Sequence, residues 1–285
     1  MAESYQFIFI FLLILTTAVE FYLGHRQKNF VLRNKKKVPT AFTKIIKLAD
    51  HQKAADYTVS KINFNSIDLV FGAIILYLLT LGGGINLMNN LMGQFFENPL
   101  LNGALIITSI FVALHLISLP SSIYQTFVIE TKYGFNKITP KLFFMDQIKS
   151  VIIMIILSAV VSFAALWILS ALGNEWWLWL WIFLSILSLI GIALAPVLKQ
   201  LFNKYTPIKD KNLKKNIEKL LRRCGFESSG LFEMNGSLRS THGNAFFGGF
   251  GKTKRIIFFD TLLEKLDTKE IEAVIAHELG HFKRN

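Results

Sequence analysis

The stretch IKSVIIMIILSAVVSFAALWILSAL, residues 148–172, holds a single charged residue, Lys149. A helix of about 20 apolar residues crosses the roughly 30 Å hydrocarbon core of a bilayer, so this stretch predicts a membrane span. Four other runs share its character: 5–24, 67–88, 101–119 and 176–195. With 52% hydrophobic residues and a mean hydropathy of +0.44, the chain is too apolar for a soluble domain. We expect a mainly α, polytopic helical bundle of five spans within residues 1–198.

A cleaved signal peptide is the alternative interpretation of the first run. No basic residue precedes it, no small-residue cleavage site follows it, and Arg26, Lys28 and Arg33 come directly after it. These features favour a retained span.

The net charge of +12 is explained by topology. No Lys or Arg occurs before the first span (residues 1–4) or in residues 89–100 or 173–175, and these three segments all lie on one side of a five-span bundle. The positive-inside rule then places the N-terminus outside and residues 199–285 in the cytoplasm. Because the basic residues do not gather in one recognised module, nucleic acid is not an expected partner. The expected partner is the lipid bilayer.

The spans carry few polar groups. Glu20 and His115 are ionisable at membrane depth, which makes them candidates for a wet interior, although snorkelling or one satisfied hydrogen bond explains them as well. Four Trp between 176 and 181 suit an interfacial aromatic belt more than a substrate box. The single cysteine, Cys224, excludes an internal disulfide.

Residues 199–285 have the composition of a small α+β segment. The apolar spacing of 210–224 predicts an amphipathic helix that Gly225 ends, with a basic face that is solvated or faces the membrane. Short strands are expected at 231–234, 244–247 and 255–259, the last two joined by a turn through Gly248, Gly249, Gly251 and Lys252. A final helix should begin at Asp267, with Glu270 completing a capping box.

The last helix carries the chemistry in AVIAHELGHFKRN, residues 273–285. His277 and His281 are four apart, so both imidazoles can bind one Zn²⁺ from the same face of a helix. Glu278 lies on the adjacent flank, where its carboxylate can act as general base toward a zinc-activated water. The alternative is a surface helix with two unrelated histidines. Against this alternative, the apolar run Ala273–Ala276 predicts a buried helix. Imidazoles and a carboxylate are unfavourable in a buried helix unless they are paired or bind a ligand.

Several stretches together resemble the type I CAAX prenyl proteases, which are membrane zinc metalloproteases. They are YGFNKIT (133–139), LFNKYTPIKD (201–210), RSTHGNAFFGGFGKTKRIIFFDTLL (239–263) and EIEAVIAHELGHF (270–282). Gly243 and Phe246 depart from the serine and tyrosine that are common in the family.

The resemblance implies seven spans around a water-filled chamber, with the zinc site at its cytoplasmic end and a third ligand, a glutamate, downstream. Two spans and that glutamate would lie past Asn285, so the zinc-metalloprotease segment is expected to be incomplete at its C-terminus and this chain inactive alone. The resemblance also implies that an Asn-Ala-aromatic strand, here Asn244, Ala245 and Phe246, pairs with extended substrate. An ordinary hairpin strand is the alternative.

The sequence therefore predicts a zinc metalloendopeptidase of a bacterial inner membrane or endoplasmic reticulum, acting on a peptide or protein that is prenylated or not. Three other classes stay open. One is an HtpX-like quality-control membrane protease, disfavoured because fewer spans usually precede its motif. Another is a non-catalytic membrane protein or stub, since Glu270 and Glu272 precede His277 on one helix and cannot complete the site. The third is a transporter or channel, if Glu20 and His115 pair inside the bundle.

Overall fold

The computed structural model describes residues 2–93, 95–226, 228–248 and 255–284, and their side chains except those of 2, 196 and 281–284. The chain divides into two compact units. The first unit comprises Met1–Gly134 and Val151–Trp167, and the second comprises Phe135–Ser150 and Ile168–Asn285.

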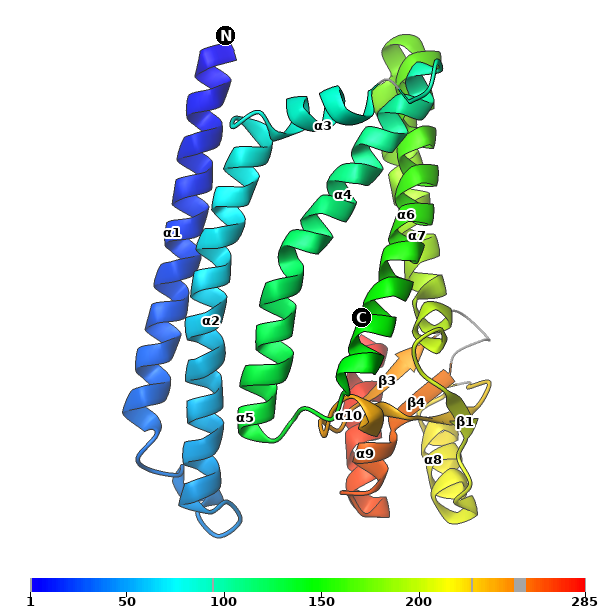
Figure 1. The fold of residues 1–285 in the computed structure, drawn as a ribbon. Coiled ribbons are helices and arrows are strands. Elements are labelled where there is room, and N and C mark those ends of the chain that lie inside the picture. The colour runs from blue at the N-terminus through cyan, green and yellow to red at the C-terminus, as the bar shows by residue number, and fades with distance from the viewer. Residues whose placement is uncertain (1, 94, 227, 249–254, 285) are drawn as a thin grey trace. The chain divides into compact units, whose positions relative to one another are not determined.

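The first unit is helical. Its elements are α1 (Ala2–Asn34), α2 (Leu48–Thr80), α3 (Gly84–Met92), α4 (Pro99–Tyr124), the π-helical stretch Gln125–Glu130, α5 (Thr131–Tyr133) and a 3-10 turn at Thr40–Phe42. The helices α1 and α2 lie side by side (Figure 1). Pro99 and the cap residue Asn98, whose side chain accepts from the backbone N–H of Leu100 at 2.8 Å, fix the start of α4.

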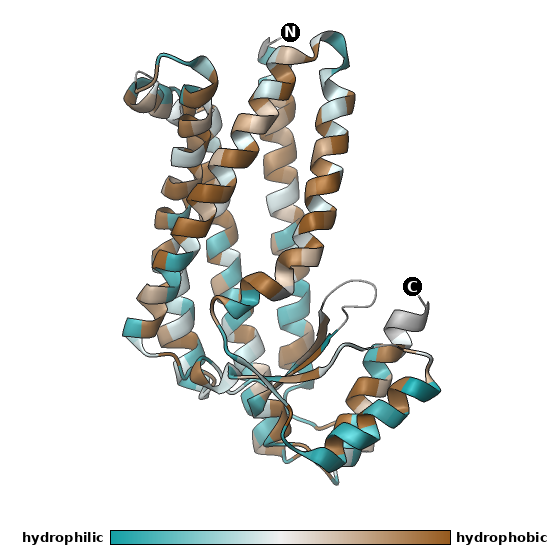
Figure 2. Ribbon diagram, turned by 90° about the vertical axis from the view of Figure 1, so that its right-hand side faces the viewer, coloured by the Kyte–Doolittle hydropathy of each residue, from teal (hydrophilic) through white to brown (hydrophobic). Residues whose placement is uncertain are grey.

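The two remaining long helices are α6 (Pro140–Ala171), which contributes to both units, and α7 (Trp176–Gln200) in the second unit. A 3-10 turn at Gly173–Glu175 joins them. Within the described residues, five helices are long and apolar enough to cross a membrane: Glu3–Asn34, Leu48–Thr80, Pro99–Tyr133, Pro140–Ala171 and Gly173–Ala195. Hydrophobic residues predominate along these helices (Figure 2). The predicted bundle of five membrane-capable helices is confirmed.

The expected boundaries of the second span, 67–88, are wrong. Its helix starts at Leu48 and ends at Thr80, and residues 84–88 belong to the separate short helix α3. The break follows from three consecutive glycines. Gly83 adopts a left-handed φ of 83°, and a Cβ at Gly82 or Gly84 would lie 2.7 Å from a backbone atom of the preceding turn.

The second unit also holds a four-stranded sheet. Its strands are β1 (Tyr205–Pro207), β2 (Leu231–Met234), β3 (Ala245–Gly248) and β4 (Arg255–Phe259), in the order β1-β2-β4-β3. The strands β2 and β4 are parallel, whereas β1 and β3 pair antiparallel with their neighbours. The predicted strands are confirmed to within one residue. The strand β1 was not expected, because three residues ending in proline carry little strand pattern.

Helices α8 (Lys211–Arg223) and α10 (Thr268–Arg284) form one hydrophobic core with the sheet, and α9 (Asp260–Leu263) and a 3-10 turn at Gly236–Leu238 complete the unit. Both predicted helix starts are confirmed. The Asp210 side chain accepts from the N–H of Asn212 at 2.8 Å, and Asp267 and Glu270 exchange side chain to backbone hydrogen bonds of 2.9 Å. Gly225, with φ 69°, follows α8 as expected.

Candidate metal centre

The helix α10 buries one side and exposes the other. Ile271, Ile275 and Leu279 are at most 4% exposed and belong to the core. His277 lies about 200° around the helix from Ile275, at 100° per residue, and is exposed. Glu278, one residue on, is half-buried. The geometry therefore presents the motif on the outward side of a helix whose other side is fixed by packing.

The expectation that Ala273–Ala276 is a buried run is wrong in part. Ile275 is fully buried, but Ala273 and Ala276 are exposed. The reason is that the sheet and α8 cover only one side of α10, so the small residues share the open side with His277. Small side chains leave the space in front of the motif accessible.

The donor set of this helix fits a zinc ion. His277 and His281 are separated by one helical turn on α10, which is the spacing that lets two imidazoles reach one metal. The side chain of His281 lies outside the described part. No three His, Cys, Asp or Glu side chains of the described part gather at one point. Glu270 is engaged in the capping box at the other end of the helix.

The strand β3 lies at one edge of the sheet and contacts α10 (Figure 1). It pairs with β4 from Ala245 opposite Phe258 to Gly248 opposite Arg255. Its other edge has no strand partner within the described residues. Unpaired backbone groups on an edge strand are available to a further extended peptide.

The side chains of the predicted substrate strand point in different directions. Ala245 is buried in the core that α8 and α10 share, whereas Asn244 is exposed. The Lys199 ammonium, at the end of α7, lies 3.9 Å from the centroid of the Phe246 ring and makes a cation–π contact with it. Only the backbone of this strand is therefore suited to bind a peptide along its whole length. The predicted turn through Gly248, Gly249, Gly251 and Lys252 falls largely on 249–254, outside the described residues.

Three stretches that carry the family resemblance meet at Arg239. Its guanidinium donates to Asp146 on α6 and to Asn203 after α7, and its backbone carbonyl accepts from the N–H of Lys137 at 3.0 Å. Sequence reasoning did not find this junction. The partners lie 93 and 36 positions from Arg239, and no local pattern links residues so far apart.

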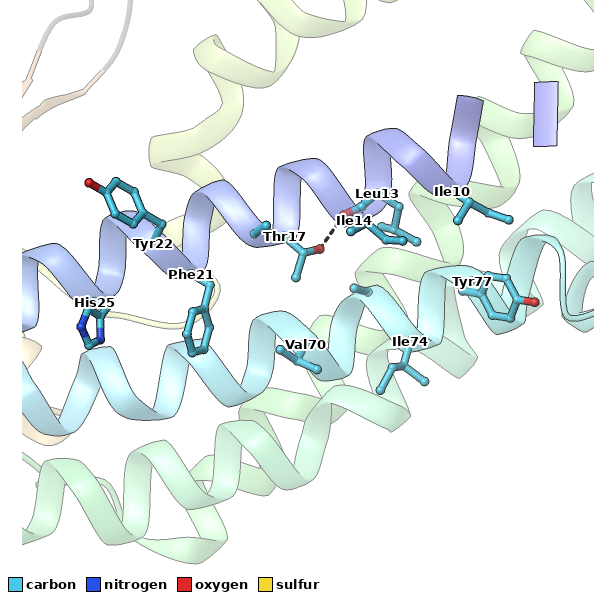
Figure 3. A pocket seen from close by; sticks show the side chains of 12 residues that line it. Ile10, Leu13, Ile14, Thr17, Phe21, Tyr22, His25, Val70, Ile74 and Tyr77 are labelled. Carbon is cyan, nitrogen blue, oxygen red and sulfur yellow. Dashed lines mark hydrogen bonds between the residues drawn. The ribbon is translucent and has the colours of Figure 1, made fainter. Parts of the chain in front are cut away.

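Glu20 and His115 form no shared site in the described part. Glu20 is exposed, and the Nε2 atom of His115 is buried without a hydrogen-bond partner. A groove of about 920 Å³ between α1 and α2 has almost entirely apolar walls (Figure 3), and its Thr17 hydroxyl donates to Leu13 of its own helix at 2.7 Å. These features suit hydrocarbon contact and give the transporter alternative no support.

Other side chains match their expected environments. The four Trp of 176–181 are 40–65% exposed, as an aromatic belt requires, and Cys224 is a free thiol. In the second unit, the hydroxyl of Tyr205 on β1 is buried without a hydrogen-bond partner in the described part. Burial raises the pKa of this hydroxyl above its ordinary value.

Comparison with known proteins identifies the family of this chain. Residues 27–204 match the family described as CAAX prenyl protease N-terminal, five membrane helices, and residues 207–285 match Peptidase family M48. The chain is 42% identical over 191 residues to the CAAX prenyl protease 1 homolog of Arabidopsis thaliana, covering 66% of this chain and 45% of that protein. It is 32% identical over 297 residues to the Dictyostelium discoideum homolog, covering 98% of this chain and 67% of that one.

The fold has a solved counterpart. The crystal structure of S. mikatae Ste24p superimposes with a TM-score of 0.88 at 30% identity, covering 96% of this chain and 65% of that one. This chain thus spans less than half the length of its Arabidopsis relative and about two thirds of the solved structure.

Proposed function

Because the chain belongs to the CAAX prenyl protease family, we propose that it forms the membrane part and zinc helix of an integral membrane metalloendopeptidase. One observation carries the proposal: α10 presents His277 and Glu278 on its open side and contacts β3, an edge strand whose outer side has no strand partner within the described residues. A peptide paired with β3 would run beside that helix.

In this proposal His277 and His281 hold one Zn²⁺, with no residue of this chain assigned as a third ligand. When bound, zinc supplies Lewis-acid polarisation of the scissile carbonyl and acidifies water. The carboxylate of Glu278 removes a proton from the attacking water and returns it to the leaving nitrogen.

The substrate is proposed to be a peptide or protein segment, prenylated or not, held in extended form by β3. Asn244, Ala245 and Phe246 contribute backbone donors and acceptors from the free edge. The buried Ala245 and the Lys199 contact of Phe246 serve to keep that edge in place. The proposal thus assigns these residues a backbone role.

The distribution of Lys and Arg supports an orientation with the N-terminus extracytoplasmic and α10 on the cytoplasmic side. A bacterial inner membrane and an endoplasmic reticulum membrane both fit this orientation. The match to a five-helix N-terminal family disfavours the HtpX-like alternative, in which fewer spans precede the motif.

The test measures peptide cleavage by the protein in detergent. Purified protein is incubated with a farnesylated peptide ending in Cys-a-a-X and with the same peptide unmodified. We expect chelator-sensitive cleavage, lowered about 10²–10⁴-fold by Glu278→Gln with unchanged zinc content by elemental analysis. Cleavage that survives Glu278→Gln would refute the proposed role, and absence of cleavage of either peptide would favour a non-catalytic membrane protein. The ratio of rates for the two peptides reports whether prenylation matters.

A further inference from the structure

We propose that Arg239 is a positioning residue for the substrate strand: it ties the loop before β3 to α6 and to the segment after α7, and so sets where the free edge of β3 lies. This inference deepens the proposed function and rests on it.

The side chain of Arg239 donates hydrogen bonds to two other side chains at once. Its Nε donates to Asp146 Oδ2 at 2.8 Å, its Nη2 donates to Asp146 Oδ1 at 3.1 Å, and its Nη1 donates to Asn203 Oδ1 at 3.0 Å. The rigid guanidinium fork suits this arrangement, and a lysine ammonium cannot reproduce it. The side chains of Arg239 and Asp146 are only 22% and 14% exposed, so solvent screens the pair weakly.

The backbone around Arg239 is held on its other side by residues 135–137. Lys137 N–H donates to the Arg239 carbonyl and Thr241 N–H donates to the Phe135 carbonyl, both at 3.0 Å. The ring of Phe135 stacks on His242 with centroids 4.3 Å apart. The loop from Arg239 to His242 is therefore an ordered, paired segment.

This ordered loop leads directly into the edge strand. Asn244, five residues after Arg239, accepts from the N–H of Phe259 at 2.9 Å, which is where pairing with β4 begins. The Lys199 contact with Phe246 gives a second attachment to the end of α7. The strand is thus held to α6 and α7 on its approach and along its length. Loosening Arg239 should let its free edge shift relative to α10.

A shift of the free edge should impair peptide binding more than chemistry. A substrate that pairs by backbone hydrogen bonds needs the donors and acceptors of β3 at fixed positions. The residues that hold the metal lie on another element, α10, which is fixed by its own packing in the core. The expected result is a higher KM at a nearly unchanged kcat.

Two variants test this without creating a new charge clash. Arg239→Lys keeps the positive charge beside Asp146 but cannot hold both partners, and Asp146→Asn keeps the size and one acceptor oxygen. The matched control is Glu218→Gln, which removes an exposed ion pair with Lys214 of 3.9 Å on α8 in the same unit.

The first measurement is hydrogen exchange of the folded protein in detergent, which does not need activity. In both variants we expect the amides of Thr241 and Lys137 to exchange about tenfold faster, while the Ile256 amide, bonded to the Gly230 carbonyl, stays protected. Unchanged exchange at Thr241 and Lys137 in both variants would overturn the inference. The control should match the parent protein at all three amides.

The second measurement is steady-state peptide cleavage by the purified protein in detergent. We expect Arg239→Lys to raise KM about tenfold with kcat within twofold. A lower kcat at unchanged KM would indicate lost folded protein and would overturn the positioning role. If the parent protein cleaves no peptide, the proposed function fails, and the exchange measurement still decides whether Arg239 orders the loop.

Discussion

At the residue scale, the buried hydroxyl of Tyr205 is expected to destabilise the folded protein. This hydroxyl has no hydrogen-bond partner in the described part of the chain. Leaving such a group unpaired costs about 1–3 kcal/mol. We expect Tyr205→Phe to raise the apparent unfolding temperature in detergent, measured by intrinsic fluorescence, because the ring is kept and the unpaired hydroxyl is removed. A lower unfolding temperature would show that the hydroxyl is hydrogen-bonded.

The same residue predicts a pH dependence. Burial raises the folded-state pKa of Tyr205 above the unfolded value of 10.0. The contribution of the protonated Tyr205 hydroxyl to the free energy of unfolding is therefore fully present below pH 10.0. It is lost as the pH rises through the folded pKa. We expect the parent protein to lose more stability between pH 9 and 11 than Tyr205→Phe, as followed by unfolding scans across that range. Parallel curves for the two proteins would contradict this assignment.

At the scale of elements, the break between α2 and α3 depends on backbone conformation. Gly83 has φ 83°, where a residue with a Cβ is strained by about 1–2 kcal/mol. We expect Gly83→Ala to lower the unfolding temperature in detergent. The matched control is Gly72→Ala inside α2, where an added Cβ meets nothing within 4 Å and the helix propensity improves. Equal effects of the two substitutions would contradict the proposed strain.

Elements with a strong local pattern could be predicted, and contacts across the chain could not. The spacing of Leu213, Ile217 and Leu221 located α8, and Asp267 with Glu270 located the start of α10. The short strand β1 and the helix α3 carry too few patterned residues. Within the site, the four-residue spacing predicts that His277 and His281 share one face of α10, and the side chain of His281 lies outside the described part. The direction of the Phe246 side chain and the partners of Arg239 depend on tertiary packing, so neither could be predicted from the sequence.

At the scale of the whole molecule, charge distribution predicts which side of the membrane each loop occupies. In a Cys224→Ser background, we expect a cysteine at Glu97 to react with a membrane-impermeant maleimide from outside and one at Lys211 only after permeabilisation. Glu97 is preferred to Asn98, because the side chain of Asn98 caps α4. Labelling of position 97 only from inside would reverse the orientation and with it the cytoplasmic assignment of α10.

The metal chemistry also depends on the whole molecule, since catalytic zinc sites hold three protein ligands and a water. On α10 the spacing assigns His277 and His281 to the ion, and Glu270 is engaged in the capping box. We expect His277→Ala to lower zinc affinity strongly in calorimetric titration, because one of the two imidazole ligands is lost. Glu278→Gln is the matched control and should retain the ion, since its carboxylate is assigned to the water and not to the metal. Unchanged zinc affinity in His277→Ala would contradict the assignment.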